Sequence, residues 1–326
     1  MIGNQKPAGL ILGFFREKRD IEEFKFKAPS YQRAYHELID GLAELGVKVA
    51  ILMGNNTYQG NGVFTKHWVQ IKTEAGYEFE KRGLVTVDAI WVKDQFDYDD
   101  QALQVNSAEF RRICSDKNLS YELLAEFHPK SLLVQDAVQL HRAFQDIPGQ
   151  MIAVKTPAGN SGINVYVGLK ADFDLAEFNK PFPYQVQEYV ETKNGIPGII
   201  KSRHDFRVVL MDGQPVIATL RTPPEGQYKS NIGYGGFTKL LGIELIPKEL
   251  LKICSQIDQR LAQIGAPRYY SADFGLTDRG WILFEINSMP GTINRDRGPE
   301  AIYYQQELEK FLVNAAQLGR EKRNQL

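Results

Sequence analysis

The chain has 326 residues, which predicts two or three lobes because single domains usually span about 100–200 residues. Hydrophobic residues make up 43% and charged residues 24%, the balance of a globular protein with a sizeable core. A formal net charge of −1 argues against a nucleic-acid partner, and two cysteines are too few for a disulfide framework. The first apolar run, Ala8–Phe15, is too short to cross a membrane and lacks a cleavage site. We therefore expect a cytoplasmic protein without membrane contact; the sequence leaves a homo-oligomer open.

The first hundred residues have the pattern of an α/β lobe. Ala8–Phe15 and Val47–Met53 are continuous apolar runs of strand length, and Tyr31–Leu45 between them has apolar residues every three or four positions. A strand, a helix and a strand at this spacing predict a right-handed parallel crossover. Val63–Phe79 is expected to form a hairpin or two irregular strands, and Val87–Val92 is expected to form a further strand.

The middle of the chain combines two short helices with a small set of strands. We expect the helices near Ser107–Cys114 and Ser120–Phe127. Met151–Thr156 and Ile163–Gly168 are expected to pair around a glycine-rich turn, and Tyr184–Val190 is a third short strand.

The last third alternates strand pairs with helices. Asp212-Gly213 is a strong hairpin signal between two apolar runs. The expected elements are strands at His204–Met211 and Gln214–Arg221, a helix at Lys248–Ile264, strands at Ser271–Leu276 and Trp281–Asn287, and a final helix at Gly298–Leu318.

Three oxygen-bearing side chains are expected to converge on the last strand pair. Glu285 and Asn287 are two apart on one strand and therefore point to one face, while Ile286 points into apolar packing. Asp273 lies on the preceding strand, across a short turn. Such oxygens suit magnesium, although acidic residues on a sheet face are often merely solvated. The run Trp281–Phe284 looks buried, which makes an unmatched charge on Glu285 costly and favours a metal site.

A second feature is Lys155 at a strand end, followed by the small-residue loop Pro157–Gly162. Backbone N–H groups of such a loop could close over phosphates, because its glycines allow close approach. The pattern matches neither the P-loop nor the dinucleotide fingerprint, and alone it is often just a turn.

Further polar residues accompany these two features. Gln187-Glu188-Tyr189-Val190 alone is an ordinary strand end. Asp205 and Arg207 share one strand face and Arg221 ends the next strand, a plausible anion site or simply surface charge on a hairpin.

Taken in this order, the motifs resemble those of ATP-grasp enzymes, and most of all glutathione synthetases and ribosomal-protein glutamate ligases. The resemblance covers roughly Ser107 to the C-terminus. It implies an α/β protein in which an ATP-grasp fold is preceded by a Rossmann-like N-terminal domain. The expected divisions are an N-terminal domain at 1–106, a middle (lid) subdomain at 107–190 and a C-terminal subdomain with the metal site at 191–326.

The resemblance also implies ATP as cofactor and a role for each matching residue. The middle lobe would contact the nucleotide through Lys130 and Lys155, with a lid formed by Gly159, Asn160, Ser161 and Gly162. The hinge at Gln187, Glu188, Tyr189 and Val190 would recognise adenine. Arg207, Arg221 and Asn231 would act near the transferred phosphate, and Asp273, Glu285 and Asn287 would hold two magnesium ions, with manganese as an alternative.

Two departures from the family pattern leave substrate choice open. Lys229 and Tyr228 stand where the glutamate ligases usually carry arginine and phenylalanine. A long insert, Glu191–Arg203, follows the hinge, and the loop Arg16–Ser30 could contact substrate.

The implied reaction joins a carboxylate to an amine through an acyl phosphate, on small-molecule or peptide substrates. A small-molecule kinase on the same scaffold would share every nucleotide-binding residue and stop after phosphoryl transfer. A non-catalytic nucleotide-binding module is the alternative of another class, but all three oxygen ligands are present. A nicotinamide-dependent dehydrogenase is disfavoured because no glycine fingerprint follows the first strands.

Overall fold

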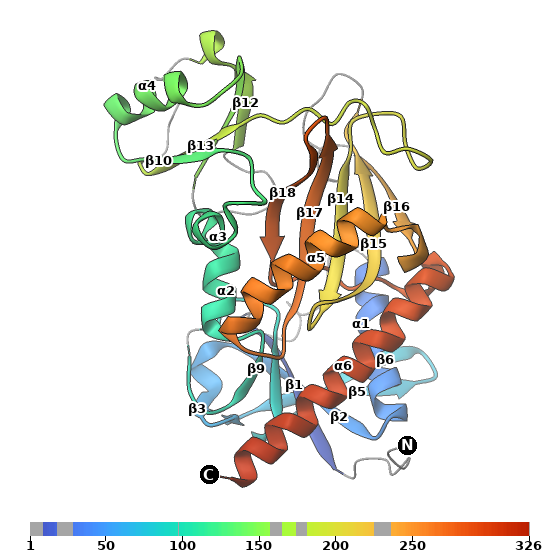
Figure 1. The fold of residues 1–326 in the computed structure, drawn as a ribbon. Coiled ribbons are helices and arrows are strands. Elements are labelled where there is room, and N and C mark those ends of the chain that lie inside the picture. The colour runs from blue at the N-terminus through green and yellow to red at the C-terminus, as the bar shows by residue number, and fades with distance from the viewer. Residues whose placement is uncertain are drawn as a thin grey trace. The chain divides into compact units, whose positions relative to one another are not determined.

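The computed structural model divides the chain into two compact units, each built from separate stretches of sequence (Figure 1). It describes residues 9–17, 29–96, 98–156, 165–173, 181–224 and 236–325. Unit 1 comprises Met1–Phe110, Ile264–Tyr269 and Met289–Leu326, and unit 2 comprises Arg111–Gln263 and Tyr270–Ser288. The C-terminal helix therefore belongs to the same unit as the N-terminal strands. The three contiguous divisions expected from the sequence stay predictions.

A six-stranded sheet in the order β6-β5-β2-β1-β8-β9 forms the centre of unit 1. Its strands are β1 (Leu10–Arg16), β2 (Val47–Met53), β5 (His67–Thr73), β6 (Gly76–Arg82), β8 (Ala89–Val92) and β9 (Leu103–Val105). The four strands from β2 to β9 are parallel, and the pairing of β1 with β2 confirms the expected crossover. The hairpin expected near Val63–Phe79 lies slightly later, as the antiparallel pair β5 and β6.

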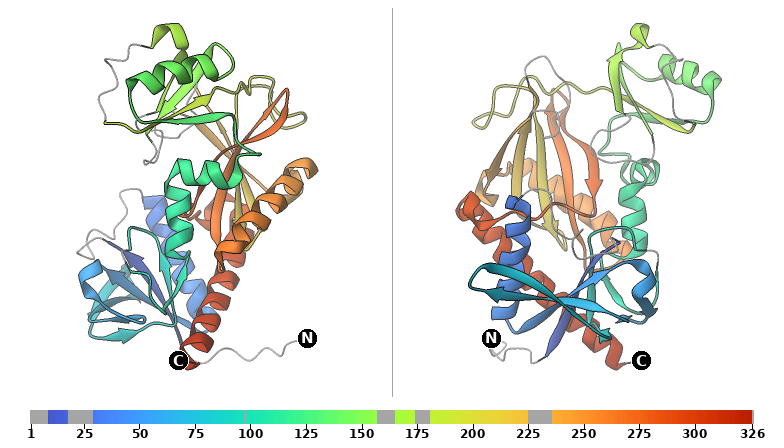
Figure 2. Two further views of the ribbon diagram at one scale, coloured as in Figure 1. Left: turned by 60° about the vertical axis from the view of Figure 1, so that its left-hand side comes forward. Right: turned by 180° about the vertical axis from the view of Figure 1, so that it is seen from behind.

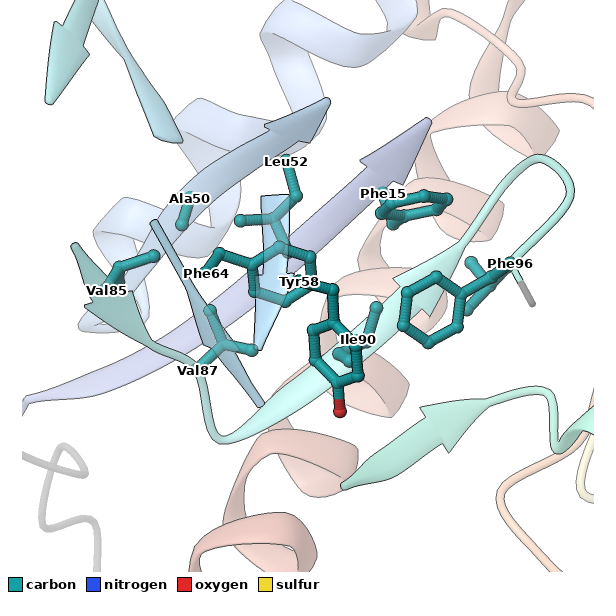
Figure 3. Close-up of a cluster of buried hydrophobic side chains, with 10 residues drawn as sticks. Phe15, Ala50, Leu52, Tyr58, Phe64, Val85, Val87, Ile90 and Phe96 are labelled. Atoms are coloured by element: carbon teal, nitrogen blue, oxygen red, sulfur yellow. The ribbon is translucent and has the colours of Figure 1, made fainter. Parts of the chain in front are cut away.

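The two faces of this sheet are covered differently. Helices α1 (Pro29–Glu44) and α6 (Pro299–Asn324) pack against one another and on one face, as Figure 2 shows from two sides. A three-stranded sheet of β3 (Tyr58–Gly60), β4 (Val63–Phe64) and β7 (Val85–Thr86) contributes Tyr58, Phe64 and Val85 to the core cluster on the other face (Figure 3). Phe14 contacts the α1 residue Tyr35, whereas the next residue, Phe15, packs in that cluster. The described part of unit 1 thus has helices on one face only, and a Rossmann-like domain is not confirmed.

The first part of unit 2 is a small antiparallel sheet with one helix packed on it. The sheet has the order β10-β13-β11-β12. Its elements are β10 (Ser131–Val134), α4 (Ala137–Asp146), β11 (Met151–Lys155), β12 (Val165–Leu169) and β13 (Tyr184–Glu188). From Ser131 the sequence leaves a helix or a strand open, and the structure has both, β10 and then α4. Helix α4 buries Leu140 and Ala143 against this sheet and begins at an Asp136 cap. Helices α2 (Ala108–Ser115) and α3 (Lys117–Leu124) precede it, close to the expected positions.

The second part of unit 2 is a five-stranded sheet in the order β16-β15-β14-β17-β18, with antiparallel pairing within β14–β15, β15–β16 and β17–β18. Its strands are β14 (Asp205–Met211), β15 (Gln214–Thr222), β16 (Phe237–Leu241), β17 (Tyr269–Thr277) and β18 (Gly280–Asn287). Helix α5 (Lys248–Leu261) buries Leu250, Cys254, Ile257 and Leu261, as its periodicity predicts. The β14–β15 hairpin turns at Asp212-Gly213, where both residues have positive φ.

Two further expectations, about the cysteines and about membrane-spanning segments, can be compared with the residues that the structure describes. Cys114 in α2 and Cys254 in α5 are both free. No helix in the part of the chain that the structure describes is long and apolar enough to cross a membrane.

Candidate functional site

Strands β17 and β18 bring the three expected oxygen ligands to one face of the five-stranded sheet. Asp273 pairs directly with Glu285, and Ser271 pairs with Asn287. Cross-strand partners lie on one face, so the side chains of Asp273, Glu285 and Asn287 share it. Ile286 between them is only 3% exposed on the opposite face, which agrees with the expected alternation.

Asp273 is the centre of a buried ion-pair network. Arg207 on β14 donates two hydrogen bonds to its carboxylate, at 2.6 and 2.7 Å, and Arg221 on β15 donates a third at 2.5 Å. The same Arg221 nitrogen also donates to Asp205 at 2.5 Å. Although burial alone would raise it, the charges of Arg207 and then Arg221 hold the pKa of Asp273 well below its usual range. Asp273 therefore stays ionised and fixed in place.

Glu285 differs from Asp273 in both exposure and partners. Its side chain is 47% exposed, and its nearest arginine nitrogen, on Arg207, is 3.9 Å away. Its carboxyl group lies beside that of Asp273, which is its cross-strand partner. Desolvation by the surrounding protein, and then the charge of Asp273, raise the pKa of Glu285. Of the two carboxyl groups, Glu285 therefore takes up a proton more readily than Asp273.

One expectation about this strand is wrong. The run Trp281–Phe284 looks buried in the sequence, but only Leu283 is buried and the other three residues are half-buried. The argument that an unmatched charge on Glu285 would be costly therefore loses force. The better argument is the repulsion between two neighbouring carboxylates, because a cation bound to both relieves it.

The donor set fits a hard cation at this position. Two carboxylates that repel one another and an amide on the same face are ligands that magnesium accepts, and one of the carboxylates is solvent-accessible. Among the residues that the structure describes, no group of three or more His, Cys, Asp or Glu side chains gathers for a metal. Any metal here would thus rest on two carboxylates, an amide and non-protein ligands.

Two lysines lie close to this carboxylate pair. Lys155, at the end of β11, donates to Gln187 at 2.5 Å, and desolvation lowers its pKa to about 8 against the opposing charge of Glu285. Lys117, in the first turn of α3, interacts electrostatically with both Glu285 and Lys155, and desolvation lowers its pKa too. Both lysines, which lie on β11 and α3 and not on the five-stranded sheet, therefore interact electrostatically with Glu285.

Lys117 is a residue that our sequence analysis missed, whereas Lys130 is not brought to this cluster. The exposed ammonium group of Lys130 donates to the Asp146 carbonyl at the end of α4, at 2.9 Å. A usable signal for Lys117 was its position directly after the helix cap Asp116, whose side chain accepts from two N–H groups of α3. A cation in the first turn opposes the helix dipole, so another interaction is expected to hold it there.

The charges of this cluster do not cancel. Four cations meet three carboxylates, which leaves an excess of one positive charge, or two when Glu285 is protonated. The cluster consists of Lys117, Lys155, Arg207, Arg221, Asp205, Asp273 and Glu285. A polyanion such as a nucleotide phosphate would therefore be attracted to it.

The expected adenine-binding hinge consists of the last two residues of β13 and the two that follow it. The backbone N–H of Glu188 donates to the Lys130 carbonyl, and its carboxylate pairs with Arg279 at 3.0 Å. Gln187 is buried and bonds both Lys155 and Ser131. Tyr189 and Val190 are half-buried. Recognition of adenine by this segment stays a prediction.

The remaining expected site residues lie outside the described residues. They are Gly159, Asn160, Ser161 and Gly162 of the expected lid, and Asn231 of the expected phosphate site.

Comparisons with known proteins point to one family. A model described as "RimK-like ATP-grasp domain" matches residues 114–302, more than half of the chain. A glutathione synthetase from Agrobacterium fabrum is 30% identical over 171 residues, 51% of this chain and 49% of that protein. A probable alpha-L-glutamate ligase from Shewanella pealeana is 27% identical over 144 residues, 44% of this chain and 26% of that protein. The chain spans about half the length, or less, of these curated relatives.

Solved structures extend the likeness to nearly the whole fold. The D-alanyl-alanine synthetase A of Vibrio cholerae has a TM-score of 0.62 at 13% identity, covering 96% of this chain and 98% of that one. The ATP-grasp ligase PsnB, in complex with a precursor variant, Mg and ADP, has a TM-score of 0.58 at 14% identity, covering 94% and 98%. At such identities the likeness shows the fold alone, and that fold is ATP-grasp.

Proposed function

The chain belongs to the RimK-like ATP-grasp family, and we propose that it uses ATP to join a carboxylate to an amine, releasing ADP and phosphate. The observation that carries this proposal is the cluster around Asp273. It combines an excess of positive charge with a pair of neighbouring carboxyl groups, so it offers groups for phosphates and for a divalent cation.

In the first step, an oxygen of the substrate carboxylate attacks the γ-phosphorus of ATP, the bond to the β-phosphate oxygen breaks and ADP leaves. Lys117, Lys155 and Arg207 hold the phosphates and offset the charge that develops on the transferred group. The product is an acyl phosphate, whose phosphate is a far better leaving group than the oxide of a free carboxylate.

In the second step, the amine nitrogen attacks the acyl carbon, the bond to phosphate breaks and the nitrogen loses a proton. Arg221 and Asn231 are the proposed donors to the acyl phosphate region. No nucleophile from the protein is required, because ATP activates the substrate itself.

Asp273, Glu285 and Asn287 would hold magnesium, and we propose two ions, with manganese as a possible replacement. When bound, the metal supplies positive charge to the phosphate oxygens. Arg207 and Arg221 donate hydrogen bonds to both oxygens of the Asp273 carboxylate and so fix its position. Lid closure by Gly159–Gly162 and adenine recognition at Gln187–Val190 complete the proposal.

The substrates are proposed by class only. Relatives are named glutathione synthetase and alpha-L-glutamate ligase, and PsnB was determined with a precursor. We therefore propose two substrates by class. One is a small-molecule or peptide carboxylate, and the other is a small-molecule or peptide amine.

A screen of carboxylates and amines for ADP release, with mass spectrometry of the products, tests the proposal. We expect ADP release to require both substrates and the product to lack one water relative to their sum. ADP release without an amine, together with a phosphorylated product, would instead establish a kinase. Binding of Mg-ATP without turnover on any pair would favour a non-catalytic module.

A further inference from the structure

The small antiparallel sheet of unit 2 has one apolar face and one polar face. Tyr184 and Val186 of β13 are both 0% exposed and pack in the core cluster that α4 covers. Gln185 and Gln187 alternate with them and therefore point to the other face, yet they are only 3% and 5% exposed. Burying two glutamines is costly unless their amide groups are hydrogen-bonded, so their partners indicate what this polar face does.

Lys155 and Ser131 lie on the same polar face. Lys155 on β11 pairs directly with Gln185, and Ser131 on β10 pairs directly with Gln187. Cross-strand partners point to one face of a sheet. Ser131 is 5% exposed, whereas Lys155 at the end of its strand is half-buried. The polar face thus gathers two amide groups and a hydroxyl group beside a lysine that we propose as a phosphate ligand.

A chain of hydrogen bonds fixes which end of the Gln187 amide faces Lys155. The Pro129 carbonyl can only accept, so the Ser131 hydroxyl donates to it, at 3.1 Å. A lone pair of that hydroxyl accepts from the Gln187 amide nitrogen at 2.9 Å, which turns the amide oxygen towards the Lys155 ammonium group, at 2.5 Å. In the reverse orientation the amide would present N–H groups to an ammonium group. Ser131 therefore sets the orientation of the acceptor that holds Lys155.

The same polar face attaches the helix that carries Lys117. The Gln185 amide nitrogen donates to the Lys117 carbonyl at 3.3 Å, and the Ser131 N–H donates to the Tyr121 hydroxyl at 3.3 Å. Lys117 and Tyr121 are four residues apart on α3 and therefore lie on one side of that helix. These two hydrogen bonds fix the first turn of α3, from which the Lys117 side chain starts, against the sheet that carries Lys155.

The groups that make these contacts are neutral. Amide, hydroxyl and carbonyl groups hold the lysines in place without cancelling their charge, whereas the carboxylate that interacts electrostatically with both is that of Glu285. A carboxylate in the place of the Gln187 amide would form an ion pair with Lys155 and compete with an incoming phosphate. A neutral acceptor leaves the full positive charge available to an anion.

We propose that Gln185, Gln187 and Ser131 form a neutral positioning layer, which holds the two lysines for the phosphates of ATP and leaves their charge intact. The assignment rests on the proposed function and deepens it, because it names residues that act through the phosphate ligands. It also gives the side chain of Gln187 a role other than adenine recognition, which then falls to residues 188–190.

Calorimetric titration with Mg-ATP in a double-mutant cycle tests whether Gln187 acts through Lys155. Gln187→Met, which is similar in shape, should weaken binding about fivefold or more, because the released ammonium group can pair with Glu285 instead. In a protein that already carries Lys155→Met, the same change should weaken binding less than about twofold. An equally large loss in both backgrounds, as a direct contact with adenine would give, would overturn the proposal.

Gln145→Met is the matched control for this change. It replaces an exposed glutamine of α4 in the same unit and should leave the affinity for Mg-ATP within about twofold. A thermal melt of each variant checks that it is folded.

Gln187→Glu tests whether the layer has to be neutral. The change keeps the length of the side chain and an acceptor for Lys155, but it adds a negative charge beside the phosphate ligands. Mg-ATP binding should therefore weaken about tenfold or more, and at least as much as in Gln187→Met. Unaltered affinity would contradict the claim that the layer preserves the charge of Lys155.

Ser131 provides a test by conservative replacement. Ser131→Ala should weaken Mg-ATP binding about threefold, because the Gln187 amide loses the partner that sets its orientation. Ser131→Thr keeps the hydroxyl group and should restore most of the affinity. Equal losses in the two variants would show that packing, and not the hydroxyl group, is what this position requires, and the role assigned to Ser131 would be wrong.

The branch through Lys117 is tested by a second cycle. Gln185→Met should weaken Mg-ATP binding about threefold in the unaltered background and less than about twofold in a protein that carries Lys117→Met. Additive losses in this cycle would remove Gln185 from the layer.

The proposed function and the positioning layer fail in distinguishable ways. Absence of Mg-ATP binding by the unaltered protein would defeat both, whereas binding with additive losses in the Gln187 cycle would defeat the layer alone. Once a substrate pair is known, Gln187→Met should raise the KM of ATP about fivefold and leave the KM values of the carboxylate and the amine within about twofold. A raised KM for the carboxylate or the amine, with that of ATP unchanged, would contradict the assignment.

Discussion

Each unit contains a cluster of charged residues, and the two clusters differ in whether the central charge has partners of opposite charge. In unit 2, Asp273 is 1% exposed and accepts three hydrogen bonds from two arginines. In unit 1, Lys93 has a carbonyl and two aromatic rings as partners and a like charge beside it. The core of two arginines and two aspartates around Asp273 is balanced and fixes a geometry before any ligand arrives, whereas like charges that lie side by side retain attraction for a ligand of opposite charge.

The unit 2 cluster also has an unbalanced edge, which is Glu285. Its raised pKa beside Asp273 and its 47% exposed side chain distinguish it from the fixed core of the network. We infer a division of roles between the two residues. Asp273 is a metal ligand with a fixed position, and Glu285 is a metal ligand whose protonation changes when a cation binds. The predictions below test this division, beginning with the largest expected effect.

Glu285→Gln should reduce turnover by about a hundredfold or more, because it keeps the shape of the side chain and removes a charge that a metal ligand needs. The apparent unfolding temperature without ligands should stay level or rise, because repulsion from Asp273 is relieved. Steady-state ADP release and a thermal melt on the same preparation measure both quantities.

Asp278→Asn is the matched control for this change. Asp278 lies in the turn of the same strand pair and is exposed, and it accepts a hydrogen bond from Asn194 rather than from an arginine of the cluster. It should leave turnover within about twofold. If Glu285→Gln lowered the unfolding temperature and left turnover intact, Glu285 would be a structural partner and the metal site would have to be abandoned.

Asp273→Ala should lower the free energy of unfolding by about 3–5 kcal/mol, because it leaves two buried guanidinium groups without their shared carboxylate. Urea denaturation, analysed with an unchanged slope, measures this difference. A loss below about 1 kcal/mol would show that water or Asp205 compensates for the missing carboxylate. The claim that Asp273 fixes the geometry of the unit 2 cluster would then be wrong.

Lys117 and Lys155 are expected to differ from Lys130 in their contribution to Mg-ATP binding. Lys117→Met and Lys155→Met should each weaken Mg-ATP binding about tenfold, because each removes one charged phosphate contact. Lys130→Met should have little effect, because its ammonium group lies on the Asp146 carbonyl. Equal losses for Lys117→Met and Lys130→Met would restore the role that the sequence suggested for Lys130.

The sequence predicted the elements whose side chains repeat regularly. Helix α5 has four buried apolar residues at steps of four and three, and the Asp212-Gly213 turn is a local signal, so both follow from nearby residues. The shared face of Glu285 and Asn287 likewise follows from the period of a strand. These predictions required no knowledge of distant contacts.

Other features depend on contacts between distant segments and could not be predicted in this way. Asp273 is paired with arginines 66 and 52 positions away, so the ion-pair network appears only after β14, β15 and β17 are assembled. The role of Lys117 depends on the approach of α3 to β18. The one-sided helix cover of the unit 1 sheet depends on α6, which returns from the end of the chain.

The smallest expected effect uses the same Arg–carboxylate pairing at a more exposed place. Arg203 donates to both carboxylate oxygens of Glu191, at 2.8 and 2.7 Å, and thereby joins the two ends of the insert Glu191–Arg203. Both side chains are about one-third exposed, so solvent screens the pair, and Glu191→Gln should lower the free energy of unfolding at pH 7 by about 1 kcal/mol or less.

The pH dependence of the stability lost in Glu191→Gln shows whether the Glu191–Arg203 contact stabilises the protein through its charges or through packing. The hydrogen bond from Arg203 lowers the pKa of Glu191 even though burial alone would raise it. A lowered pKa in the folded protein means that the stabilisation is present above the unfolded value, about 4.3, and is lost as the pH falls through the folded value. Urea denaturation at pH 7 and pH 3.5 should therefore show the variant approaching the unaltered protein in acid. If the free energies of unfolding of the variant and the unaltered protein differed as much at pH 3.5 as at pH 7, packing and not charge would stabilise this pair. Burial would then not be the property that distinguishes the Glu191–Arg203 pair from the pairs of Asp273.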